Sequence, residues 1–152
     1  MAHVHEHKQC QAQARANAEA ICHQKGVRFT ELRKQVLELI WESHEPAKAY
    51  DLLARIDQNT AAIKPPTIYR ALDFLLEHGL IHKLDSLNAY IGCNHPMTQH
   101  DCYFLICSEC GRVDECCDER FGDMISGVTA ENDFQVKDVT FEMIGICGQC
   151  KH

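Results

Sequence analysis

The chain has 152 residues, of which 24% are charged and 45% hydrophobic, and its formal net charge at pH 7 is −7. That length suits one ordinary domain or two small ones. No apolar run reaches the ~18 residues that a membrane-spanning helix requires, and this excludes a helical membrane protein.

The spacing of apolar residues predicts four helices before residue 79. Gly26 and Gly79 suit the ends of the first and fourth helices, Thr30 can cap the second, and Pro65 and Pro66 suit the start of the fourth. The apolar faces consist, in chain order, of Ala14, Ala18, Ile21 and Cys22; of Leu32, Val36, Leu37 and Ile40; of Tyr50, Leu53 and Ile56; and of Ile68, Ala71, Leu72, Leu75 and Leu76.

A short hairpin is expected after these helices, with strands over 80–84 and 89–91. Helices followed by a hairpin indicate a winged helix-turn-helix, in which the fourth helix would enter the major groove of DNA. Arg70 lies on its polar face and can read guanine, and Lys64, Thr67 and Tyr69 lie close enough to reach phosphates or bases. The alternative is an ordinary solvated face, and the acidic net charge favours that alternative.

The second half of the chain has a different charge and pattern. Residues 1–84 contain 11 basic and 10 acidic side chains, whereas residues 85–152 contain 4 and 12. A hinge is expected over 92–99, a strand before Cys107, a short segment at Val113, a helix over 117–130 and strands over 133–146. The expected buried side of that helix consists of Phe121, Met124, Ile125 and Val128. The prediction is an α+β protein with a small α/β unit after the winged helix.

Two Cys-x-x-Cys pairs lie in the last third, Cys107 with Cys110 and Cys147 with Cys150. Four thiolates spaced in this way are typical of a tetrahedral structural zinc site, which would hold the ends of the second unit together. Disulfides or buried thiols remain the alternatives. The N-terminal sequence MAHVHEHKQC does not resemble a signal peptide, so we expect a reduced, cytoplasmic protein.

Four stretches together resemble the bacterial ferric-uptake-regulator family, and most closely its zinc-sensing branch: VRFTELRKQVL, AYDLLARI, KPPTIYRALDFLLEHGLIHKL and HDCYFLICSECG. The resemblance covers about residues 15–150 and keeps the order of every motif. It implies a zinc-responsive repressor that binds a palindromic operator in double-stranded DNA as a homodimer and controls zinc-uptake genes. It further implies a winged-helix domain over 1–91, a hinge over 92–99 and a zinc-clipped α/β dimerisation domain over 100–152. Residues 1–9 form a His-rich tail, which we expect to be disordered.

The resemblance also implies two zinc sites per protomer. The structural site corresponds to the four paired cysteines, and the sensing site corresponds to His82, Cys93, His100 and Glu115. His95 could replace His100, and Cys116 could replace Glu115. One thiolate, two imidazoles and one carboxylate favour zinc over Mn²⁺. Phe104 stands where iron-sensing relatives often carry His, which weakens an iron assignment.

Among DNA contacts, Tyr50 resembles a position that approaches DNA, and Arg28 one near the phosphate backbone. Three other readings remain open: a family member that senses another metal or peroxide, a thiol redox protein, and a zinc-clipped interaction module without DNA binding. No HExxH or similar signature is present, so we expect neither catalysis nor a small organic substrate. No role is assigned to the remaining cysteines, Cys10, Cys22, Cys102, Cys116 and Cys117.

Overall fold

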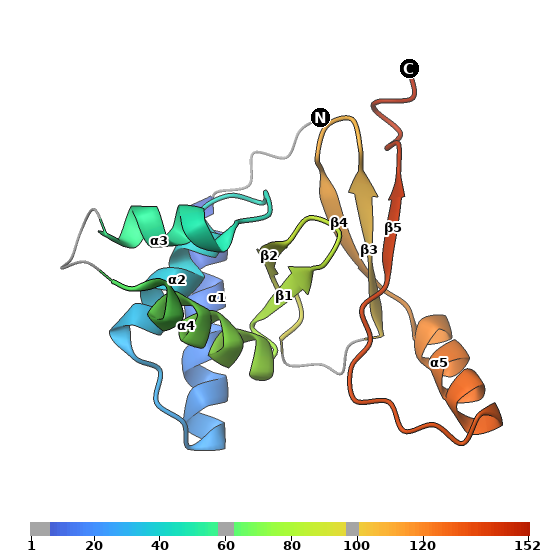
Figure 1. Ribbon diagram of the computed structural model, residues 1–152, viewed down its shortest axis with the longest axis horizontal. Coiled ribbons are helices and arrows are strands. Elements are labelled where there is room, and N and C mark those ends of the chain that lie inside the picture. Colours follow the sequence, from blue (N-terminus) through green and yellow to red (C-terminus); the bar gives the residue numbers. More distant parts are fainter. Residues whose placement is uncertain (1–6, 58–62, 97–100) are drawn as a thin grey trace. The chain divides into compact units, whose positions relative to one another are not determined.

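A computed structural model of the chain describes residues 7–57, 63–96 and 101–152 (Figure 1). The chain divides into two compact units, residues 1–97 and 98–152. No helix in these described ranges is both long enough and apolar enough to cross a bilayer. The domain limits and the hinge expected from the sequence remain a prediction, and α1 begins at His7, inside the stretch expected to be disordered.

The first unit consists of four helices and a hairpin. The helices are α1 (His7–Lys25), α2 (Glu31–Ile40), α3 (Ala49–Asp57) and α4 (Pro65–Glu77), and the antiparallel strands are β1 (Ile81–Leu84) and β2 (Ala89–Gly92). The expected caps are present: Gly26 and Gly79 have φ of 65° and 69°, and the Thr30 side chain accepts a hydrogen bond from the Arg33 amide. These caps end and begin the helices where the sequence predicts them.

A single apolar core holds the first unit together, because each helix turns one stripe inward. The largest side chains that are almost fully buried are Val36, Leu37, Ile40, Leu52, Ile68, Leu72, Leu75, Ile81 and Leu84. The loop before α3 joins the hairpin through a two-residue bridge, in which Ala47 and Tyr90 exchange backbone hydrogen bonds of 2.8 Å. This bridge fixes the hairpin against the start of α3.

The second unit is a three-stranded sheet with one helix. Its strands are β3 (Cys102–Cys107), β4 (Val113–Cys117) and β5 (Glu142–Gly145), in the order β4-β3-β5, and its helix is α5 (Glu119–Glu131). Strand β4 is antiparallel to β3, whereas β5 is parallel to it. The crossover between β4 and β5 contains α5, whose Phe121 ring stacks on Tyr103 at 4.4 Å between centroids.

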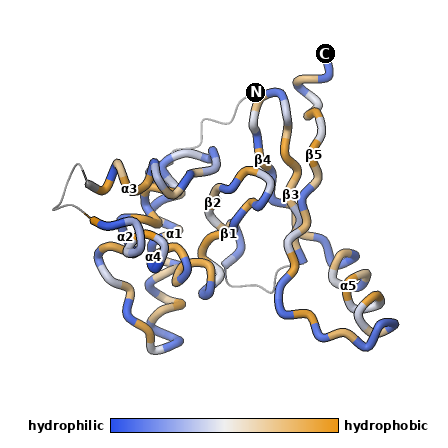
Figure 2. Tube along the Cα trace, viewed as in Figure 1, coloured by the Kyte–Doolittle hydropathy of each residue, from blue (hydrophilic) through white to orange (hydrophobic). Residues whose placement is uncertain are grey.

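The second unit lacks a deep core of its own. None of the residues of α5 is buried in the single chain, and Met124 and Val128, expected on its inner side, are 49% and 55% exposed. Nine of the eleven exposed large hydrophobic residues that the structure describes belong to this unit. Parts of both β5 and α5 are apolar, as the orange stretches in Figure 2 show. The periodicity therefore predicted the helix correctly but not what covers its apolar side.

Candidate metal centres and nucleic-acid interface

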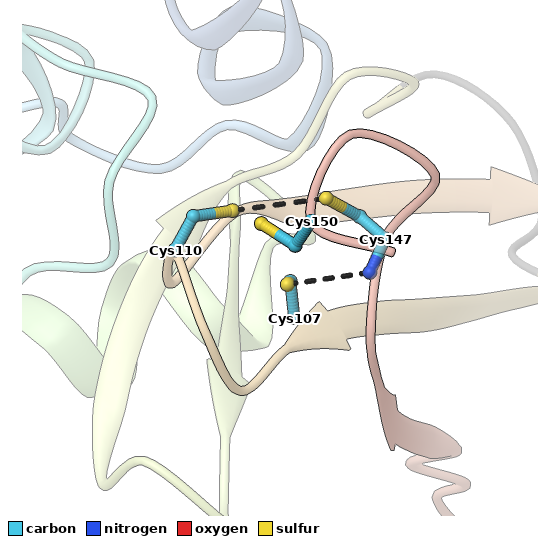
Figure 3. A group of neighbouring side chains, drawn as sticks. All are labelled: Cys107, Cys110, Cys147 and Cys150. Carbon is cyan, nitrogen blue, oxygen red and sulfur yellow. Dashed lines mark hydrogen bonds between the residues drawn. The ribbon is translucent and has the colours of Figure 1, made fainter. Parts of the chain in front are cut away.

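The two Cys-x-x-Cys pairs meet at one end of the second sheet. Cys107 ends β3 and lies opposite Gly145 of the parallel strand β5, so the chain segments that carry the two pairs leave the sheet side by side. All four sulfur atoms lie within 4.8 Å of one another, and those of Cys110 and Cys147 are 3.9 Å apart. Figure 3 shows the four side chains converging on one point.

Backbone amides donate hydrogen bonds that stabilise a thiolate in this cluster. The amide of Cys147 donates to the Cys107 sulfur at 3.3 Å. Hydrogen bonds from backbone amides, chiefly that of Cys110 and secondly that of Cys147, lower the pKa of Cys107 to about 6. Side-chain hydrogen bonds with Cys147 and Cys110 raise the pKa of Cys150 to about 12. Four neighbouring thiols cannot all ionise unless a cation balances them. The donor set and its spacing fit a tetrahedral zinc ion.

Two of the four predicted sensing residues lie together in the first unit. His82 lies in β1, and Cys93 directly follows β2, where its amide donates to the Leu80 carbonyl at 3.1 Å. A ring nitrogen of His82 and the Cys93 sulfur are within 4.8 Å of each other. Cys93 is only 3% exposed. The hairpin thus supplies one nitrogen and one sulfur donor from adjacent strand ends.

The other two predicted sensing residues belong to the second unit. Glu115 lies in β4 opposite Phe104, and His100 is outside the described residues. Of the alternatives, His95 is exposed, and Cys116 lies opposite Tyr103. Because successive strand residues face opposite sides, Cys116 and Glu115 present their side chains to different faces of the sheet. The four-residue sensing set stays a prediction.

The DNA-contact candidates gather mainly around the start of α4. Lys64 is the residue at its N-cap, and Thr67, Tyr69 and Arg70 on its first turns are exposed. The sequence placed Tyr50 on the buried side of α3, but Leu52 is buried there instead. Tyr50 is 67% exposed and Tyr69 is 51% exposed. These side chains are therefore available to a ligand.

A polar hollow of about 120 Å³ connects this region to the hairpin. Tyr50 and Tyr69 line it together with Lys48 from the loop before α3 and Lys83 from β1. Neither lysine could be predicted from the sequence, because the Ala47–Tyr90 bridge that brings them together has no local sequence signal. Two cations beside two tyrosines suit a phosphate group.

Arg28 lies outside this hollow, in the loop between α1 and α2. It is exposed, and its carbonyl accepts a hydrogen bond from the Arg33 guanidinium. Arg33 itself stacks over the Phe74 ring at 3.7 Å and so helps to attach α2 to α4. The Arg28 side chain remains a candidate for a contact to the DNA backbone.

Comparison with known proteins identifies relatives along almost the whole chain. A sequence model described as the Ferric uptake regulator family matches residues 24–144. The Zinc uptake regulation protein of Escherichia coli K12 is 40% identical over 134 residues, which cover 88% of this chain and 78% of that protein. A solved structure of a zinc uptake regulator with zinc and DNA has a TM-score of 0.86 at 38% identity, over 93% of this chain and 95% of that one. The structure of holo XcZur has a TM-score of 0.82 at 39% identity, with coverages of 93% and 98%.

Proposed function

Since this chain belongs to the ferric uptake regulator family, we propose that it is a zinc-responsive transcriptional repressor, which binds a palindromic operator as a homodimer when zinc is plentiful. Its targets would be zinc-uptake genes, and it would act in the cytoplasm. One observation carries this proposal: two metal donors, His82 and Cys93, lie within 4.8 Å of each other on the hairpin of the unit that exposes Arg70.

DNA recognition rests on the N-terminal turns of α4. Arg70 would make a bidentate contact to guanine, and Tyr69 and Thr67 would contact neighbouring bases or phosphates. Lys64, Tyr50 and Arg28 would position the helix on the backbone, with Lys48 and Lys83 holding a phosphate in the hollow. A net charge of −7 gives little general attraction to DNA, so the few cations near α4 must supply it.

The structural zinc would be bound by Cys107, Cys110, Cys147 and Cys150. When bound, zinc supplies the positive charge that allows all four cysteines to ionise. These cysteines lie at or just after the ends of β3 and β5, so joining them would keep the two strands paired. A small unit without a deep core gains stability from such a link.

The sensing zinc would take His82 and Cys93 from the first unit and His100 and Glu115 from the second. Ligands from both units would restrict the hinge over 92–99 and thereby fix how two reading helices are spaced in a dimer. A coupling free energy of ~1–3 kcal/mol between zinc and DNA binding changes affinity about 5- to 150-fold. That range is sufficient for a metal-dependent switch.

The homodimer would form through the second unit. Its exposed apolar residues include Phe134, which is 67% exposed, and Ile144, which is 63% exposed. A monomeric protein rarely exposes so many large apolar side chains. A second copy of the chain would cover them, because a two-fold interface places the same patch on both partners.

The direct test is zinc-dependent retention of genomic DNA fragments by the purified protein, after a weak chelator has removed zinc from the sensing site. We expect zinc to enrich one palindrome and Mn²⁺ or Fe²⁺ to enrich it much less. Enrichment by Fe²⁺ or Mn²⁺ instead would favour a family member that senses another metal. Equal retention with and without every metal would favour a zinc-stapled thiol protein without operator binding.

A further inference from the structure

Two cysteines without a role in the proposed repressor are covalently joined. Cys102 begins β3 and Cys117 ends β4, and a disulfide connects them. Neither residue belongs to the Cys-x-x-Cys cluster or to the proposed sensing set. The pairing goes beyond the proposed function and raises the question of what the two sulfur atoms do when they are reduced.

The strand register places these cysteines side by side. The Cys107 amide donates to the Arg112 carbonyl at 2.9 Å, and five residues away from each of these, at the other end of the ladder, Cys102 lies opposite Cys117. The adjacent pair is hydrogen-bonded, since the Asp118 amide donates to the Asp101 carbonyl at 3.0 Å. Hydrogen-bonded and non-hydrogen-bonded pairs alternate, so Cys102 and Cys117 form a non-hydrogen-bonded pair, in which side chains are closest. The backbone therefore keeps the two sulfurs close whether or not they are bonded.

A third donor completes this group. Glu115 is two residues before Cys117 on β4, so its side chain shares a face of the strand with Cys117. A carboxylate oxygen of Glu115 and the two sulfur atoms all lie within 4.8 Å of one another. Cys117 is exposed, and Cys102 and Glu115 are half-buried, so the group is open to solvent and small reagents.

We propose that, when the sensing zinc is absent and Glu115 is not a ligand there, Cys102, Cys117 and Glu115 form a redox-gated zinc site, which binds zinc as a dithiol and releases it as the disulfide. Two thiolates and one carboxylate are three of the four donors that zinc takes, and a water molecule can supply the fourth. Zinc–sulfur bonds of about 2.3 Å place tetrahedral ligands nearly 4 Å apart, a spacing that small rotations of these three side chains reach.

The oxidant is a small disulfide such as oxidised glutathione. The more exposed Cys117 thiolate attacks one sulfur of oxidised glutathione and expels the other as glutathione thiolate. Cys117 and the attacked sulfur then form a mixed disulfide. The Cys102 thiolate then attacks the Cys117 sulfur and expels the second glutathione. Two electrons pass from the protein to the small disulfide, and the zinc ion leaves because both sulfur donors have been consumed.

Zinc content under reducing and oxidising conditions tests this proposal in the full chain. A Cys93→Ser background disables the proposed sensing site, so additional zinc is not bound there. In that background, we expect the reduced protein to hold about one more zinc ion per protomer than protein oxidised with glutathione disulfide. Peptide mapping by mass spectrometry should identify a Cys102–Cys117 link in the oxidised sample alone.

Matched variants assign the effect to these residues. Cys117→Ser and Cys102→Ser should each abolish the difference in zinc content, whereas Cys116→Ser, one residue away on the other face of the strand, should preserve it. Glu115→Gln should weaken the binding of the additional zinc ion. Circular dichroism verifies that the variants fold.

The proposal is overturned if reduced and oxidised proteins hold equal zinc, or if glutathione disulfide does not join Cys102 to Cys117. A difference that survives Cys117→Ser but disappears in Cys116→Ser would assign the chemistry to Cys116 instead. Failure of zinc-dependent DNA binding would not bear on any of these outcomes, because the zinc content is measured without DNA.

Discussion

At the scale of single residues, the four sulfur atoms of the Cys-x-x-Cys pairs lie within 4.8 Å of one another. The spacing within each pair is a local property, so each pair could be read directly from the sequence. The Lys48–Lys83 hollow and the Cys102–Cys117 pair could not be read in that way, since both depend on strand register. The position of Cys102 opposite Cys117 follows only once the turn between Cys107 and Arg112 is known to join two antiparallel strands.

We expect Arg70→Ala to weaken operator binding by ~1–3 kcal/mol while leaving binding to random DNA almost unchanged, because the bidentate contact to guanine is lost. Fluorescence anisotropy with operator and scrambled duplexes, at fixed salt, measures both affinities. Glu77→Ala, at the exposed C-terminal end of the same helix, is the matched control. An equal loss on both duplexes would make Arg70 a phosphate contact.

Cys93→Ala should reduce zinc content by about one ion per protomer and remove the zinc dependence of operator binding, because the buried sulfur next to His82 is lost. The zinc held by the Cys-x-x-Cys pairs should remain. Metal analysis combined with zinc-titrated anisotropy separates the two sites. Full zinc-dependent binding by this variant would show that the sensing set has been assigned to the wrong residues.

At the scale of secondary structure, local signals set most helix ends, and tertiary contacts set the rest. The prolines and Gly79 predicted α4, which spans Pro65–Glu77. The helix expected over 117–130 begins later, at Glu119, because β4 continues to Cys117 and the Asp118 side chain caps the helix. Strand pairing is non-local, so the boundary between β4 and α5 had no signal in the periodicity.

Gly92→Ala should destabilise the first unit by about 1–3 kcal/mol, because an added Cβ would lie 2.2 Å from the Trp41 ring. Gly127→Ala, in α5 of the second unit, is the control: a Cβ there meets nothing within 4 Å, so unfolding of the first unit should be unchanged. Urea unfolding followed by Trp41 fluorescence reports on the first unit. Unchanged stability of the Gly92 variant would mean that the indole ring moves aside at little cost.

At the scale of the whole molecule, the two units differ in what they need for stability. The first unit buries its apolar residues within one chain, whereas the second leaves residues such as Met143 and Ile144 exposed. The sequence indicated this division through charge, which is balanced before residue 85 and acidic after it, and through a change from helical to strand-like patterns. It could not show that the apolar side of α5 is uncovered, because periodicity identifies an apolar face but not its partner.

Ile144→Glu should convert a dimer into monomers, since the charge would have to be buried against the same patch of a second copy. Sedimentation velocity over a range of concentrations measures the change. Lys137→Glu, an exposed polar position in the same unit, should leave the dimer intact. A dimer that persists in the Ile144 variant would place the interface elsewhere.

The parallel pairing of β3 with β5 also governs the order of folding. Phe104 pairs with Glu142, 38 positions later, so this ladder forms only after a long loop has closed. The first unit relies mainly on helices and a tight hairpin, whose contacts are local and form rapidly. Refolding should therefore show two phases: a fast one that is independent of metal, and a slow one whose rate rises with zinc concentration. A newly synthesised chain would then have a folded DNA-binding unit before its second sheet is complete.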